Sequence, residues 1–160
     1  MKQQQELLIK LVLDNWYTHV SRTDKLLDSL TDEQLLHEIA PGRNRGIYLL
    51  GHLAAVHDRM LPLLGFDAQH RPEMDAIFLT SPDKAVQDMP SVTDLRAYWK
   101  DVNNTLDKHF KTMQPDDWFS KHTSVSEEDF AKEPHRNRLN IVLGRTSHLA
   151  NHLGQLLLLK

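Results

Sequence analysis

Apolar residues recur at steps of three and four along four segments of the chain. Such spacing places them on one face of an α-helix, because about 3.6 residues complete one helical turn. In the first segment, Val12, Trp16, Thr23 and Leu30 follow this spacing. No segment shows convincing alternation of apolar and polar residues, which is typical of a half-buried strand. The sequence therefore predicts an all-α protein with long helices over residues 2–30, 45–64, 91–113 and 139–159.

Turn-forming residues separate these helices. Thr31, followed three positions later by Gln34, predicts a capping box that opens a short extra turn after the first helix. Two longer connections, over residues 66–90 and 114–138, contain prolines and mixed polarity. The first of them carries one predicted helical turn near residues 73–78. Four amphipathic helices with one short and two long connections predict a four-helix bundle.

Length and charge indicate a single globular domain. A chain of 160 residues has the size that forms one core, so we expect residues 1–160 to be one four-helix-bundle domain. The net charge of -3 gives no electrostatic reason to expect binding to nucleic acid. The N-terminal segment lacks the features of a secretion signal, and no run of about 18 apolar residues occurs. We therefore expect a cytoplasmic protein that does not bind membranes.

The sequence restricts the residue types that are available for chemistry. It contains no cysteine, which excludes disulfides, thiolate metal sites and a cysteine nucleophile. Any thiol that takes part in a reaction must come from another molecule. Histidine, aspartate and glutamate remain as strong metal ligands, and the chain has 10 histidines scattered along its length.

Two of these histidines form a pair on the last predicted helix. His148 and His152 stand four residues apart, on one face, so two neutral imidazoles can converge on one transition-metal ion. Such a pair also occurs as boundary residues that hydrogen-bond to side chains or water and bind nothing. Arg145 and Gln155 lie within about 60° of His148 on a helical wheel. Either side chain can orient the ligands or hold an anionic part of a substrate. Alternatively, Arg145 lies on the surface and has no special role.

A third histidine on the second predicted helix can complete a site. His52 and His57 are five residues apart and about 140° out of phase, so both cannot face one ion. Periodicity alone does not choose between them. His19 on the first helix is a weaker candidate, and its alternative role is to fill an apolar stripe. The other histidines lie in predicted loops or on polar faces, and we expect no special role for them: His37, His70, His109, His122 and His135.

Two motifs resemble those of the DinB-like superfamily, which includes the DinB and YfiT branches. They are the run YLLGHLAAVHDRM in the second helix and the run HLANHLGQL in the last helix. The resemblance covers nearly the whole chain and implies an up-down-down-up four-helix bundle that forms a homodimer. It also implies a divalent metal ion held by His52, His148 and His152, with His57 exposed or in contact with a ligand. The leucines at 156–159 are apolar on almost all sides of the helix end. This pattern fits a helix end that is buried on two sides in a dimer, and a helix end sunk in the protein's own core gives the same pattern.

The resemblance suggests a function. Three imidazoles leave a coordination shell incomplete, as in catalytic zinc sites. Characterised members of the superfamily are described as metal-dependent transferases or isomerases that use a thiol such as bacillithiol, mycothiol or glutathione. We therefore expect a zinc- or nickel-dependent transferase that joins a low-molecular-weight thiol to a small electrophilic substrate. The alternatives are a hydrolase that uses metal-activated water, and a non-catalytic, stress-related interaction module. Asp58 and Glu38 are near in sequence, but neither is an evident general base.

Overall fold

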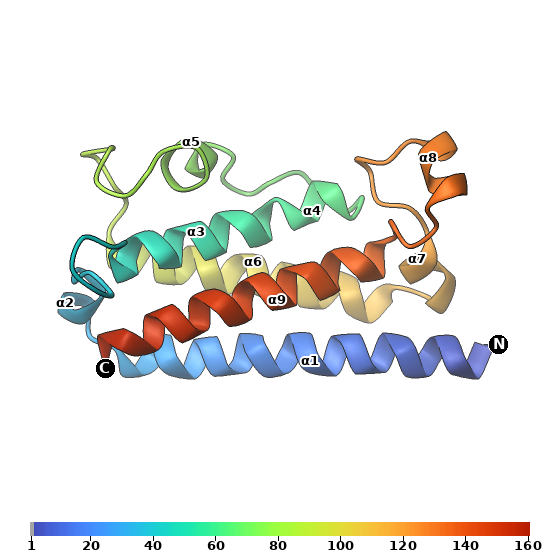
Figure 1. Ribbon diagram of the computed structural model, residues 1–160, viewed down its shortest axis with the longest axis horizontal. Helices are drawn as coiled ribbons and strands as arrows, with labels where there is room; N and C mark the ends of the chain where they lie inside the picture. The colour runs from blue at the N-terminus through green and yellow to red at the C-terminus, as the bar shows by residue number, and fades with distance from the viewer. Residues whose placement is uncertain (1) are drawn as a thin grey trace.

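Four long helices lie side by side, and the first of them runs along the whole length of the molecule (Figure 1). The structure is a computed structural model that describes residues 2–160. In that range it contains helices and no strand, which confirms the all-α class. The long helices are α1 (Lys2–Ser29), α3 (Gly46–Asp58), α6 (Val92–Thr112) and α9 (Arg138–Leu156).

The long helices run in two directions. Figure 1 shows that α1 and α9 proceed toward the end of the molecule that carries the C-terminus, whereas α3 and α6 proceed away from it. Helix α1 packs mainly against α9, and α3 packs mainly against α6. Helix α3 also contacts α9, so these two antiparallel helices are neighbours. That contact brings the histidines of the second and last predicted helices into the same region.

The connections contain several short helices. The capping box at Thr31 is confirmed, because its hydroxyl accepts a hydrogen bond from the Gln34 backbone and the Gln34 side chain accepts one from the Thr31 backbone. A short helix also forms close to the predicted turn at 73–78. The short segments are α2 (Asp32–Leu35), α4 (Met60–Leu63), α5 (Met74–Phe78), α7 (Pro115–Phe119), α8 (Glu127–Lys132) and a 3-10 turn, η1 (Leu157–Leu159).

The second predicted helix, 45–64, is divided in the structure. Pro62 has no N–H, so the carbonyl of Asp58 lacks its usual helical partner four residues later. Helix α3 ends at Asp58 for this reason, and α4 resumes the helical path at Met60. Gly65 then ends the segment with φ of 74°, a left-handed conformation that glycine adopts without strain.

The last predicted helix also ends earlier than expected, with its final residues in a 3-10 turn. The chain itself buries the leucine-rich end on one side only. Leu156 and Leu159 are buried, but Leu157 is 50% exposed and Leu158 is 64% exposed. Two of the four leucines point into the protein's own core because a helical turn directs successive side chains to different sides. The homodimer stays a prediction.

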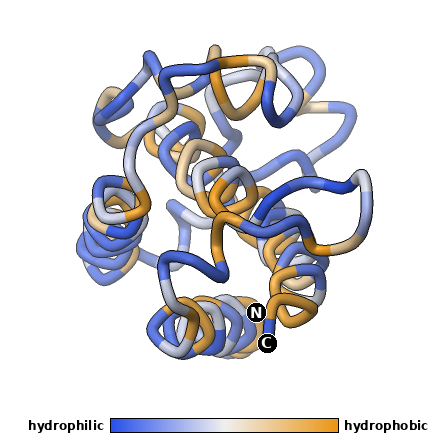
Figure 2. The backbone as a smooth tube through the Cα atoms, turned by 90° about the vertical axis from the view of Figure 1, so that its left-hand side faces the viewer, coloured by the Kyte–Doolittle hydropathy of each residue, from blue (hydrophilic) through white to orange (hydrophobic). Residues whose placement is uncertain are grey.

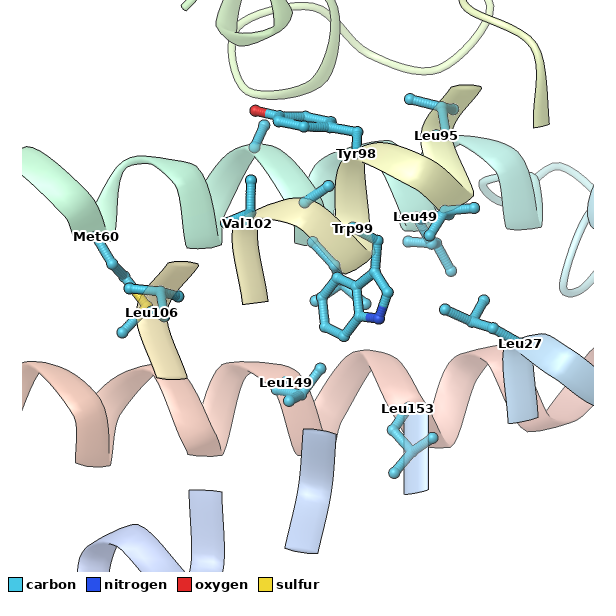
Figure 3. Close-up of a cluster of buried hydrophobic side chains, with 14 of the residues drawn as sticks. Leu27, Leu49, Met60, Leu95, Tyr98, Trp99, Val102, Leu106, Leu149 and Leu153 are labelled. Atoms are coloured by element: carbon cyan, nitrogen blue, oxygen red, sulfur yellow. The ribbon is translucent and has the colours of Figure 1, made fainter. Parts of the chain in front are cut away.

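Apolar side chains from all four long helices meet in the core. Viewed along the bundle, each long helix alternates hydrophilic and hydrophobic residues around its turns (Figure 2). In Figure 3, the indole of Trp99 on α6 lies between the leucines of α3 and those of α9, including Leu49 and Leu149. Within residues 2–160, no helix combines the length and the apolar character needed to cross a bilayer.

Candidate metal centre

Three histidines from two helices meet where α3 crosses α9. The Nε2 atom of His148 lies 3.0 Å from Nε2 of His52 and 3.1 Å from Nε2 of His152. His148 and His152 share a face because they are one turn apart on α9. His52 comes from the neighbouring helix α3. One nitrogen from each ring lies within 4.8 Å of the others, which is the arrangement expected of a group that can hold a metal ion.

Hydrogen bonds fix which nitrogen of two rings carries the proton. Nδ1 of His52 is 2.9 Å from the backbone carbonyl of Phe78, and Nδ1 of His152 is 2.7 Å from Oε1 of Gln155. Carbonyl oxygens only accept hydrogen bonds, so each Nδ1 donates. The Nε2 atoms of His52 and His152 therefore present lone pairs to the centre of the cluster, as metal ligands do.

His148 lies between these two lone pairs. Its Nε2 can donate one proton, so it can satisfy one neighbour and not both. Its Nδ1 is buried and has no hydrogen-bond partner within residues 2–160. A cation at the centre accepts all three lone pairs and removes this mismatch. In a tetrahedral site with metal–nitrogen distances of about 2.0–2.1 Å, ligand nitrogens lie about 3.3 Å apart. The two distances from Nε2 of His148, 3.0 Å and 3.1 Å, are within a few tenths of an ångström of this value.

The cluster contains nitrogen ligands alone. No aspartate or glutamate of residues 2–160 joins the three histidines in a group close enough to share an ion. A closed structural site needs a fourth protein ligand, whereas three ligands leave room for water or a substrate atom. The donor set thus fits a divalent transition metal such as zinc or nickel in an open site.

The surroundings keep His52 and His148 neutral at pH 7. Burial lowers the pKa of His52 below its usual range, and burial together with the charges of His152, His52 and Arg145 lowers the pKa of His148 to about 4. A neutral imidazole has a free lone pair and binds metal, whereas a protonated one does not. The rings of His52 and His148 are therefore available as ligands without losing protons first.

His57 does not belong to this cluster, and the expectation that it is exposed is wrong. Its ring is fully buried between Trp16 and Trp99, with ring centroids 4.8 Å and 4.9 Å away. Its Nδ1 donates to Oδ1 of Asn103 over 2.9 Å. Burial lowers the pKa of His57 to about 3. The phase difference along α3 sends His57 into the core and leaves His52 to meet α9.

The two polar neighbours on α9 differ in their contacts. Gln155 bonds to His152, as described above. Arg145 is half-buried, and its positive charge lowers the pKa of both His52 and His148. No ion pair or side-chain hydrogen bond connects Arg145 to another of the residues 2–160. Arg145 is therefore not a fully exposed surface residue, and its charge acts on the histidines of the cluster.

The two carboxylates near the motifs have other roles. Asp58 is fully buried and accepts hydrogen bonds from the backbone of His70 and Arg71, at 2.8 Å and 2.9 Å, and from the Tyr98 hydroxyl at 2.7 Å. It therefore ties the first long connection to α3 and α6. Glu38 pairs with Lys84. Neither residue joins the histidine cluster.

The remaining histidines lie outside the cluster as well. His19 bonds through Nδ1 to the carbonyl of Asn15 at 2.9 Å, within its own helix. His122, expected on a polar surface or in a loop, is 8% exposed and contacts the Ser124 hydroxyl. Sequence patterns could not identify the Phe78 carbonyl as a partner of His52, because any residue type offers the same backbone oxygen.

Gly51 supports the cluster through Phe78. A Cβ at Gly51 would overlap the ring of Phe78, whose carbonyl orients His52. We expect Gly51→Ala to destabilise the protein by about 1–2 kcal/mol, because overpacking outweighs the better helix propensity of alanine. Gly144→Ala on α9 is the matched control, because a Cβ there meets nothing within 4 Å. It should stabilise by about 0.5–1 kcal/mol. Urea unfolding measures both, and equal effects would contradict the packing argument.

Gln155 is expected to tune metal affinity through His152. Gln155→Ala removes the acceptor of the His152 Nδ1–H and should weaken metal binding about 10- to 100-fold. Gln155→Glu keeps an acceptor and adds negative charge, so affinity should stay the same or increase. Competition with a chromogenic chelator measures the affinities. Asn151→Ala, an exposed change on the same helix, should have no effect.

Comparison with known proteins links the motifs to a family. The family model described as the DinB superfamily matches residues 15–156, which include both motifs and all three clustered histidines. No curated protein matches the chain.

Proposed function

Because the chain belongs to the DinB superfamily, we propose that it is a metalloenzyme in which His52, His148 and His152 hold one divalent ion. We further propose that it transfers a low-molecular-weight thiol to a small electrophilic substrate. The observation that carries the proposal is the convergence of three Nε2 atoms, of which two present lone pairs.

The ion supplies Lewis-acid chemistry, since a bound divalent metal lowers the pKa of a thiol or water that it coordinates. The residues of the chain orient that ion. Phe78 and Gln155 hold the rings of His52 and His152 in the required tautomer. His148 completes the set from the middle of the cluster. The open part of the shell is the place for the nucleophile.

The chemistry of a bound divalent ion favours a thiol over water as the nucleophile. A free thiol has a pKa of about 8.5, so a thiol that coordinates the ion is fully ionised at pH 7. Metal-bound water keeps a pKa near 7 and is only partly ionised there. The chain has no cysteine, so the thiol is a second substrate.

The test begins with metal content. Untagged protein should contain about one equivalent of zinc or nickel per chain by elemental analysis. The metal-loaded protein is then incubated with a reactive alkyl or aryl halide and with bacillithiol, mycothiol or glutathione in turn, and loss of free thiol is followed. His52→Ala should lose this activity, whereas His37→Ala, an exposed histidine outside the cluster, should keep it.

The outcomes separate the three functions. Thiol-dependent turnover that requires metal supports the transferase. Turnover of ester or amide substrates without thiol identifies a hydrolase instead. Protein that binds no divalent transition metal fits the non-catalytic helical bundle, and the proposal is then wrong.

A further inference from the structure

Arg145 lies on the same face of α9 as the clustered histidines. It precedes His148 by three residues, so the two side chains are about 60° apart around the helix. Burial lowers the pKa of Arg145, and the nearby charge of Arg59 lowers it further. A half-buried guanidinium has lost part of its hydration, and the lost hydration must be replaced by a partner.

Two other half-buried arginines in this protein have such partners. Arg45 forms an ion pair with Asp83 at 2.7 Å. Arg96 donates to the carbonyls of Leu27 and Leu30 at 2.6 Å and 2.8 Å. Arg145 has neither an ion pair nor a side-chain hydrogen bond within residues 2–160. Arg138 is also half-buried without a side-chain partner in the described chain, but it precedes His148 by ten residues. Arg145 is one turn from His148, so a molecule that binds at the cluster can supply its partner.

Arg59 extends the positive region along α3. It follows His52 by seven residues, two helical turns, and therefore lies near the same face of the helical path. Its Nε donates to Asp75 at 2.8 Å, which holds the side chain by its inner nitrogen. Among residues 2–160 its two terminal amino groups have no hydrogen-bond partner. They can share a bound anion with Arg145, because the charges of the two residues act on each other.

Arg145 is the charged side chain that lowers the pKa of both His52 and His148. The three histidines are neutral ligands, so a divalent ion keeps its full charge there, and Arg145 adds another positive charge. No carboxylate of the described chain joins the cluster. Such a region attracts anions and repels cations. A guanidinium also offers two parallel N–H groups that match a carboxylate or phosphate.

We propose that Arg145 binds an oxyanion group, carboxylate or phosphate, of the molecule whose reactive atom reaches the metal ion. The inference rests on the proposed function and names its substrate class: an anionic small molecule, held at one end by Arg145 and at the other by the ion. Arg145 is then a specificity-determining residue. Arg59 assists it from α3.

The test compares two small thiols that differ in charge. Protein loaded with Co²⁺ is titrated with 3-mercaptopropionate or with 2-mercaptoethanol, and the sulfur-to-metal charge-transfer absorption reports binding without any catalysis. Wild-type protein should bind the carboxylate thiol about 10-fold or more tightly than the neutral one. Arg145→Gln should remove this preference, and Arg145→Lys should restore part of it. Arg22→Gln, a change of an exposed arginine, should leave the preference unchanged.

The results distinguish this inference from the proposed function. Protein that takes up no Co²⁺ contradicts the metal site and the inference together. Protein that binds Co²⁺ and prefers neither thiol, or whose preference survives Arg145→Gln, overturns the inference alone. Competition by acetate and by inorganic phosphate then shows which oxyanion the site prefers.

Discussion

Replacing His148 with alanine is expected to abolish metal binding and the part of the stability that depends on metal. His148 is the central ligand, since its Nε2 lies 3.0 Å and 3.1 Å from those of His52 and His152. A ligand at 100 times its dissociation constant stabilises the folded state by about 2.7 kcal/mol. In a domain of this size that corresponds to about 5–10 °C in melting temperature. Chelator should therefore lower the melting temperature of wild-type protein by this amount and should leave that of His148→Ala unchanged.

The variant should still fold without metal. His148 is half-buried, and its Nδ1 has no hydrogen-bond partner to lose. We expect the metal-free variant and metal-free wild-type protein to differ by no more than about 1 kcal/mol. Differential scanning calorimetry with and without chelator measures both effects, with His37→Ala as the control that keeps the response to chelator. Metal-dependent stabilisation of His148→Ala would rule out the three-histidine site.

Acidification is expected to destabilise the metal-free protein through His57. Burial between two tryptophans lowers the pKa of His57 to about 3, from an ordinary value near 6.5 in the unfolded chain. The unfolded state therefore binds the proton more tightly than the folded state. His57 has no effect on stability well above pH 6.5, and stability falls as the pH falls from 6.5 toward 3. Each pH unit in this window amounts to about 1.4 kcal/mol, so the loss is about 3 kcal/mol at pH 4.

The comparison with His57→Phe isolates this contribution. Phenylalanine keeps a ring between Trp16 and Trp99 and cannot be protonated, although it leaves Oδ1 of Asn103 without its donor. The variant should be less stable at pH 7 by about 1–3 kcal/mol, yet its stability should depend less on pH. Urea unfolding from pH 7 to pH 4, in chelator, gives both curves. His52 and His148 contribute to both chains, so their effects cancel in the difference, and parallel curves would contradict the assignment to His57.

Local features were predictable because they depend on near neighbours in the chain. The long helices follow from the spacing of apolar residues, and the cap at Thr31 follows from its own side chain and that of Gln34. The division of the second helix was missed although Pro62 stood in the sequence. A proline is tolerated in the first turn of a helix. Pro62 therefore fits the new short helix α4, although it interrupts the longer helix that the apolar spacing predicted.

The histidine cluster combines both kinds of information. His148 and His152 share a face by helical geometry alone, whereas the sequence pattern left His52 and His57 equivalent. The structure resolves this choice through the rotation of α3. The space between Trp16 and Trp99 takes His57 into the core, and His52 is directed toward α9 as a result.

Backbone periodicity over a few turns was enough to specify the helices, their apolar faces, and the pair of imidazoles on the last helix. Periodicity left His52 and His57 open, and the DinB-like motifs implied His52, which the structure brings to that pair. The backbone oxygen that orients His52, and the lack of a partner for Arg145 within the described chain, were evident only in the folded protein. These features depend on the packing of side chains far apart in sequence, because the rotation of each helix is set by its neighbours in the core.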